Sequence, residues 1–169
     1  SHMLDQAMVI FGMPKSVTAD LRIQRPGSEV NDYFLVKLNY NDTVVTIKGG
    51  LLVREQGPRY IIHGTEGSFL KYGIDPQEEA LKNGHLPDEP GWGQEPENDW
   101  GMLNTRMNGL HYDGYIETYP GDYQGYFNNI YHAIRQGETL AVPAEEGLNV
   151  IRVIHAAIKS SKEGKTIEI

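Results

Sequence analysis

The stretch from His63 to Glu79 constrains the fold of this chain more than any other. It reads His-Gly-Thr-Glu-Gly-Ser-Phe-Leu-Lys-Tyr-Gly-Ile-Asp-Pro-Gln-Glu-Glu. Gly64 and Gly67 bracket a tight turn, because glycine adopts the backbone angles that such turns require. The apolar residues on both sides of the turn therefore predict a hairpin of two strands, over 60–63 and 68–72.

A short helix is predicted directly after this hairpin. Gly73 ends the second strand, and Asp75-Pro76 is typical of a helix start, with a capping carboxylate followed by proline at the first helical position. Asn83-Gly84 then stops the helix after few residues. The chain thus turns from sheet to helix within this one segment.

Alternating apolar and polar residues predict three strands before the hairpin, over 17–25, 33–40 and 43–54. The third contains Gly49-Gly50, a pair that marks a bulge or a close approach by another backbone or a ligand, and we interpret it as a bulge. The links between the strands are short. This favours antiparallel pairing, since a parallel crossover needs about a dozen residues or more.

The remaining pattern indicates an α+β fold. We expect one large, mostly antiparallel open sheet with helices packed on one face, in a single domain over 4–169. Ser1-His2-Met3 is typical of what a cleaved affinity tag leaves behind. Residues 84–110 are predicted to form a long loop, either a lid or an arm toward a partner. Three helices and two further strands are predicted over 4–11, 122–137, 142–163, 112–119 and 166–169.

Composition excludes several classes of partner. Fifteen basic and 23 acidic side chains give a net charge of -8, which disfavours nucleic acid because phosphate binding needs a basic surface. No apolar run approaches the length of a bilayer crossing, so no membrane span is predicted. With no cysteine there is no thiolate metal site, and the sequence predicts a cytoplasmic protein.

Few residues stand out as candidates for binding. No glycine-rich dinucleotide turn and no metal-ligand spacing occur, so neither a bound cofactor nor a metal is expected in this chain. Lys48, beside the glycine pair, could bind a substrate hydroxyl or phosphate, or simply be a solvated strand lysine. Lys71 and Tyr72 point to opposite faces of their strand, so at most one of them faces a given cavity. Tyr126 could bind a sugar hydroxyl or belong to the core.

Three carboxylates, Asp32, Asp113 and Asp122, could in principle pair for acid–base chemistry. Asp122 is also explained as a helix cap and the other two as residues at strand ends. Both interpretations of these carboxylates stay open at this point.

Several motifs in a specific order give the chain a family resemblance. It resembles the C-terminal domain of the Gfo/Idh/MocA family of NAD(P)-dependent oxidoreductases, which has a fold like the C-terminal domain of glyceraldehyde-3-phosphate dehydrogenase. The motifs, besides 63–79, are Leu4-Asp5-Gln6-Ala7, Asp32-Tyr33-Phe34, Gly91-Trp92-Gly93, Gly121-Asp122-Tyr123 and Val142-Pro143.

The resemblance implies a division of labour between two domains. An N-terminal Rossmann domain, absent here, would bind NAD or NADP and supply the catalytic lysine, while this domain would enclose a sugar, cyclitol or similar polyol and form a homodimer through a sheet face. His2 is at the register of a family histidine that aids proton transfer, although it also belongs to the possible tag remnant. The alternative is a non-catalytic binding or scaffold module that uses the same sheet.

Overall fold

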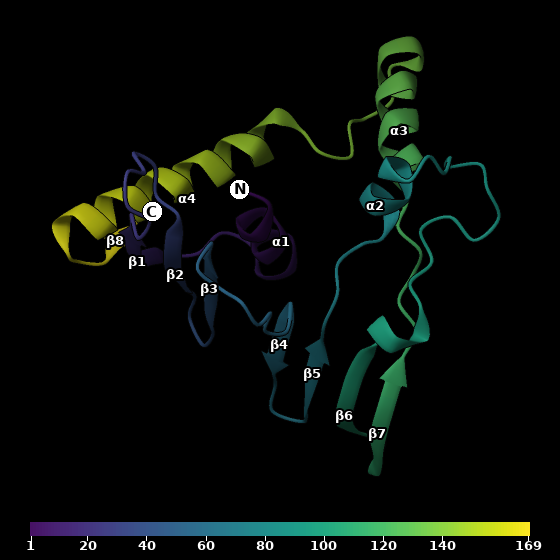
Figure 1. Ribbon diagram of the computed structural model, residues 1–169, viewed down its shortest axis with the longest axis horizontal. Helices are drawn as coiled ribbons and strands as arrows, with labels where there is room; N and C mark the ends of the chain where they lie inside the picture. Colours follow the sequence, from purple (N-terminus) through teal and green to yellow (C-terminus); the bar gives the residue numbers. More distant parts are fainter. The chain divides into compact units, whose positions relative to one another are not determined.

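The computed structural model of the chain describes residues 1–169, which form two compact units (Figure 1). Unit 1 comprises residues 1–54 and 142–169, and unit 2 comprises residues 55–141. The α+β class and the antiparallel pairing are confirmed. The strands are divided between two four-stranded sheets, whereas the sequence analysis predicted one large sheet.

Unit 1 is an antiparallel sheet with two helices. Its strand order is β3-β2-β1-β8, and all the pairs are antiparallel. The predicted helices at both ends of the chain are present, and the predicted strand at the C-terminus is a short edge strand. The elements are α1 (His2–Phe11), β1 (Ser16–Arg22), β2 (Tyr33–Asn39), β3 (Val44–Gly50), α4 (Ala144–Glu163) and β8 (Ile167–Glu168).

The core of unit 1 lies between its helices and its sheet. Helix α4 packs on β1, and α1 packs on α4 and β3 (Figure 1). Val17, Leu38 and Val153 are each 0% exposed, and seven further apolar side chains complete the buried cluster. Helix α4 contributes Val150, Val153, Ala156 and Ala157 to this cluster. No helix of the chain combines the length and the apolar character that a membrane crossing requires.

The glycine pair ends strand β3 instead of forming a bulge within a longer strand. Gly49 is paired with Phe34 on β2, and the phenyl ring lies where a side chain at Gly49 would project, 2.6 Å from the ideal Cβ position. A larger residue would displace the ring. The glycine is therefore explained by the close approach of an aromatic side chain from the neighbouring strand.

Two serine side chains of α4 accept hydrogen bonds from backbone amides on the unpaired edge of strand β1. Pairing with β8 covers only Ser16 and Val17. Beyond this point the amide of Ala19 donates to Ser160 Oγ at 2.9 Å, and the amide of Leu21 donates to Ser161 Oγ at 3.0 Å. The helix thus supplies acceptors that a neighbouring strand would otherwise provide, which removes an exposed pairing edge.

Unit 2 is built on the predicted hairpin. Its sheet has the order β4-β5-β6-β7, again antiparallel throughout, and α2 lies at the base of the upright helix α3 (Figure 1). The elements are β4 (Tyr60–His63), β5 (Gly67–Lys71), α2 (Gln77–Lys82), the 3-10 helix η1 (Glu97–Asp99), β6 (Gly101–Met107), β7 (Leu110–Ile116) and α3 (Tyr123–Gln136).

Strand β6 occupies the last part of the predicted loop 84–110, so the loop ends at Trp100. Adjacent apolar residues, Met102 and Leu103, obscure the alternation that would have indicated a strand. The missed signal is the turn: Asn108 (φ 51°) and Gly109 (φ 81°) join β6 to β7. Asn-Gly between two strands is among the strongest short-range indications of a hairpin.

Candidate substrate-binding site

Lys71, at the end of β5, is held by two acceptors from one loop segment. Its ammonium lies 2.5 Å from Glu95 Oε2 and donates to the carbonyl of Asp99 at 2.6 Å. The side chains of Lys71 and Glu95 are only 11% and 5% exposed. Two of the three ammonium N–H groups are therefore used within the protein, which leaves one for a ligand.

These contacts fix a segment of the long loop, residues 92–99, which we call the strap. Gly73, directly after β5, has φ 75°, and a side chain there would meet the Asp99 side chain at 3.2 Å. The strap is thus attached both to the end of β5 and to the turn that follows it. It is held by an ion pair of low exposure and by close packing.

Gln77 joins the strap to two other segments. Its side chain is 1% exposed, and its Oε1 accepts from Trp92 Nε1 and from the Tyr123 amide, both at 2.8 Å. Its Nε2 donates to the carboxylate of Asp75 at 3.0 Å, and Asp75 Oδ1 also accepts from the Gln77 amide at 2.9 Å. Asp75 therefore binds the first amide of α2, close to its predicted role as helix cap.

A second link between the same segments passes through two glycines. The Gly121 amide donates to the carbonyl of Gly93 at 3.0 Å. Gly93 has φ 72°, and its Cβ position would overlap the backbone of Gly121. Gly93 has to be glycine because the two backbones touch, and at Gly121 a side chain would collide with those of Asp75 and Gln77. The predicted motifs 63–79, 91–93 and 121–123 thus converge on one polar junction.

The tyrosines nominated from the sequence are exposed. Tyr72 is 50% exposed and Tyr126 is 57% exposed, and neither hydroxyl has a hydrogen-bond partner in the chain. Tyr126 lies on α3, where its ring meets Phe127 edge to face with centroids 5.2 Å apart. Both phenols therefore have free donor and acceptor capacity.

Lys48 and His2 belong to unit 1, whereas Lys71, Tyr72 and Tyr126 belong to unit 2. Lys48 is on β3, exposed, and paired in register with Leu35. His2 is the exposed first residue of α1. Neither makes an ion pair. The role of the four lysine and tyrosine residues in substrate binding, and that of His2 in proton transfer, stay predictions.

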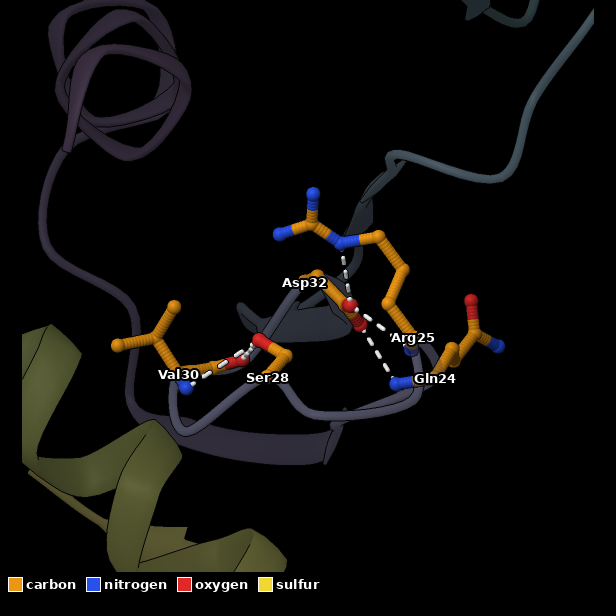
Figure 2. Close-up of polar contacts among 5 residues, drawn as sticks. All are labelled: Gln24, Arg25, Ser28, Val30 and Asp32. Carbon is orange, nitrogen blue, oxygen red and sulfur yellow. Dashed lines mark hydrogen bonds and ion pairs between the residues drawn. The ribbon is translucent and has the colours of Figure 1, made fainter.

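The three carboxylates considered for acid–base chemistry are each bound separately. Asp32 accepts from the amides of Gln24 (2.7 Å) and Arg25 (3.0 Å) and from Arg25 Nε (3.0 Å), as Figure 2 shows. These bonds, first that from the Gln24 amide, hold the pKa of Asp32 below its ordinary value, and its side chain is 1% exposed. Asp32 fixes the turn between β1 and β2.

Asp122 caps α3, as predicted, by accepting from the Gly125 amide at 2.8 Å. Asp113 accepts from the side-chain amide of Asn104 at 3.1 Å, across the β6–β7 pair. None of the three carboxylates is paired with another. Each is explained by a local structural contact, and no group of three or more histidine and carboxylate side chains could hold a metal ion.

Sequence reasoning missed a polar row across the sheet of unit 2. His63 Nδ1 lies 2.8 Å from Ser68 Oγ, and His111 Nε2 lies 3.1 Å from Asn104 Oδ1. The register places Ser68 opposite Asn104, so the row shares one face. Beside it is a shallow hollow of about 570 Å³ lined by Thr65, Glu66, Asn104, Thr105, Arg106 and His111. Only the pairing of β5 with the unpredicted β6 brings these residues together.

The face of the sheet that carries the polar row also carries a row of apolar side chains beside it. Ile61 is opposite Leu70, Leu70 is opposite Met102, and Met102 is opposite Tyr115. Of these side chains, Ile61, Met102 and Tyr115 are 57%, 38% and 63% exposed. We call this set of four residues the apolar row.

Comparison with known proteins identifies the class. A family model described as the oxidoreductase family, C-terminal alpha/beta domain, matches residues 1–169. The chain belongs to this Gfo/Idh/MocA oxidoreductase family and corresponds to its C-terminal domain.

Individual relatives agree with this assignment. The chain is 46% identical over 170 residues to scyllo-inositol 2-dehydrogenase (NADP(+)) IolW from Bacillus subtilis, covering 99% of the chain and 47% of the relative. It is 39% identical over 167 residues to the uncharacterized oxidoreductase YdgJ from Escherichia coli, covering 98% of the chain and 47% of that protein. The chain thus spans about half the length of the curated relatives it matches.

Solved structures share the fold. The oxidoreductase yvaA from Bacillus subtilis superimposes with a TM-score of 0.94 at 44% identity, over 99% of this chain and 49% of that one. An oxidoreductase from Bacteroides fragilis gives a TM-score of 0.92 at 42% identity, over 99% and 51%. The predicted family and domain are therefore confirmed.

Proposed function

We propose that this chain is the substrate-binding and dimerisation domain of an NAD(P)-dependent oxidoreductase that acts on a cyclitol, sugar or similar polyol. The observation that carries the proposal is the 46% identity, over nearly the whole chain, to a relative named as an inositol dehydrogenase that uses NADP(+). A polyol presents several hydroxyls to its enzyme. The free phenols of Tyr72 and Tyr126 are suitable partners for them.

The chemistry of such an enzyme divides between its domains. The carbinol carbon would give a hydride to C4 of the nicotinamide and the hydroxyl would give its proton to a base, so that a ketone would result. The NAD or NADP would be held by an N-terminal Rossmann domain, since this chain has no glycine-rich dinucleotide turn. This domain would bind and orient the polyol, with Lys48, Lys71, Tyr72 and Tyr126 as candidate ligands.

The activity test uses the longer protein. We expect it to reduce NADP(+) or NAD in the presence of scyllo-inositol or a related polyol. In the longer protein, Tyr126→Phe should raise KM by about fivefold if the phenol donates to or accepts from substrate, since a lost hydrogen bond is worth about 1 kcal/mol. Tyr119→Phe is the matched control, because Tyr119 is 94% exposed and was not nominated as a ligand.

A nicotinamide titration tests the proposed division of labour between the two domains. The 169-residue chain should bind neither NADP(+) nor NAD by calorimetry, whereas the longer protein should bind one of them. Tight nicotinamide binding by the shorter chain would contradict the proposal. Absence of turnover by the longer protein, with every polyol tried, would favour the non-catalytic scaffold.

We also propose a homodimer formed through the apolar row. Contiguous exposed apolar side chains on a sheet face are typical of an interaction surface, and a two-fold axis lets the same surface meet itself. Tyr115→Asp should convert the dimer to a monomer in light scattering, because it would bury an unpaired charge. Tyr119→Asp should leave the dimer intact. A wild-type monomer at high concentration would contradict this part.

A further inference from the structure

The side-chain oxygen of Gln77 accepts hydrogen bonds from two segments that are far apart in the sequence. The indole of Trp92 comes from the strap, and the amide of Tyr123 is the first of helix α3. Both bonds are 2.8 Å long, and the Gln77 side chain is 1% exposed. No water can therefore replace either donor without opening the junction.

The orientation of this oxygen is fixed from the other side. Gln77 Nε2 donates to both carboxylate oxygens of Asp75, which prevents the amide from rotating to follow one donor alone. The contact of Gly93 with Gly121 joins the same two segments at the backbone. Moving the strap therefore disturbs the start of α3, and moving α3 disturbs the strap.

We propose that Gln77 couples the strap to helix α3, so that residues 92–99 and the first turn of α3 open and close as one unit. Tyr126 lies in that first turn, so a ligand or partner that orders it would also order the strap. The coupling itself rests on the contacts of Gln77 and does not depend on the proposed function.

Hydrogen exchange of two protons tests the proposal in the protein without substitutions. The chain has two tryptophans, so the indole N–H of Trp92 is readily assigned by comparison with Trp100→Phe. We expect the Trp92 indole proton and the Tyr123 amide to share one opening constant, larger than that of the β6–β7 amides. Separate constants would overturn the proposal. A constant shared with the β6–β7 amides would overturn it too, because the whole of unit 2 would then be opening.

Lys71→Met tests the coupling from a distance. It releases the strap from its ion pair without touching Gln77 or α3. We expect protection of the Trp92 and Tyr123 protons to fall by the same factor, at least about tenfold, because a buried carboxylate loses its partner. A fall confined to Trp92 would overturn the coupling.

Gln77→Glu adds a pH-dependent test of the junction. The new carboxyl would lie about 3.0 Å from the Asp75 oxygens, where Nε2 lies now, so one of the two groups must have a raised pKa. Protection of both protons, relative to wild type, should be near normal at low pH and fall together as pH rises through that pKa. Gln136→Glu, the same change at an exposed site on α3, should show no such dependence. Different pH profiles for the two protons would contradict the proposal.

Discussion

Unit 1 and unit 2 are held together by different kinds of contact. Every one of the ten buried apolar side chains belongs to unit 1. In unit 2 the side chains of lowest exposure are polar, namely Lys71, Gln77 and Glu95, while large apolar residues such as Phe127 and Leu110 are 66% and 75% exposed. A polar junction fixes geometry well but contributes little net stability, because water competes for the same bonds. The geometry of unit 2 is therefore set more by polar contacts than by a buried apolar core.

The largest effect is expected in the core of unit 1. Leu38→Ala should lower the free energy of unfolding by about 3 kcal/mol, through lost burial and a cavity, since the side chain is 0% exposed. Leu110→Ala in unit 2 is the matched control, and its effect should stay within about 0.5 kcal/mol. Urea denaturation measures both. Equal losses of unfolding free energy in the two variants would contradict the view that only unit 1 has a buried apolar core.

Breaking the ion pair of unit 2 should have the next largest effect. Lys71→Met leaves Glu95 at low exposure without its cation, and should destabilise unit 2 by about 2 to 3 kcal/mol. The double variant Lys71→Met with Glu95→Gln should recover a large part of the loss, because the unpaired charge is gone. Thermal denaturation of the single and double variants tests this. Additive losses would mean that the two residues act independently.

A smaller effect is expected where helix α4 closes the edge of β1. Ser160 is 1% exposed, accepts from the Ala19 amide and donates to the Lys165 carbonyl at 2.6 Å. Ser160→Ala leaves both backbone groups unsatisfied, so we expect a loss of about 1 to 2 kcal/mol. Ser28→Ala, which changes a serine with only local loop contacts, should have almost no effect. Hydrogen exchange at Ala19 would report the lost bond directly.

The smallest effect is expected at Asp32, and it should disappear in acid. The Asp32 pKa is lowered in the folded protein by bonds from the Gln24 amide and Arg25, so its carboxylate stabilises the folded state above the ordinary value of 3.8. That contribution is lost as pH falls from there through the lowered folded pKa. Asp32→Asn should be less stable than wild type at neutral pH, and the difference should shrink below about pH 4. A pH-independent difference would exclude this role.

Local signals in the sequence identified most of the elements. Asp122 and Gly137 define α3, which spans Tyr123–Gln136, and the hairpin around Gly64 and Gly67 forms as predicted. Strand β6 was missed because its apolar residues do not alternate. The turn at Asn108-Gly109 would have indicated it.

The sequence by itself determined the family, the antiparallel α+β class and the positions of helices α1, α3 and α4, because periodicity, caps and glycine turns act over a few residues. Only the tertiary structure decided that the motif residues of unit 2 form a junction around Gln77, and that Lys71 is bound to the strap. Those contacts join residues up to 46 positions apart in the chain, from Gln77 to Tyr123. No local pattern specifies such a pairing, since it depends on which backbones the fold brings close enough to touch.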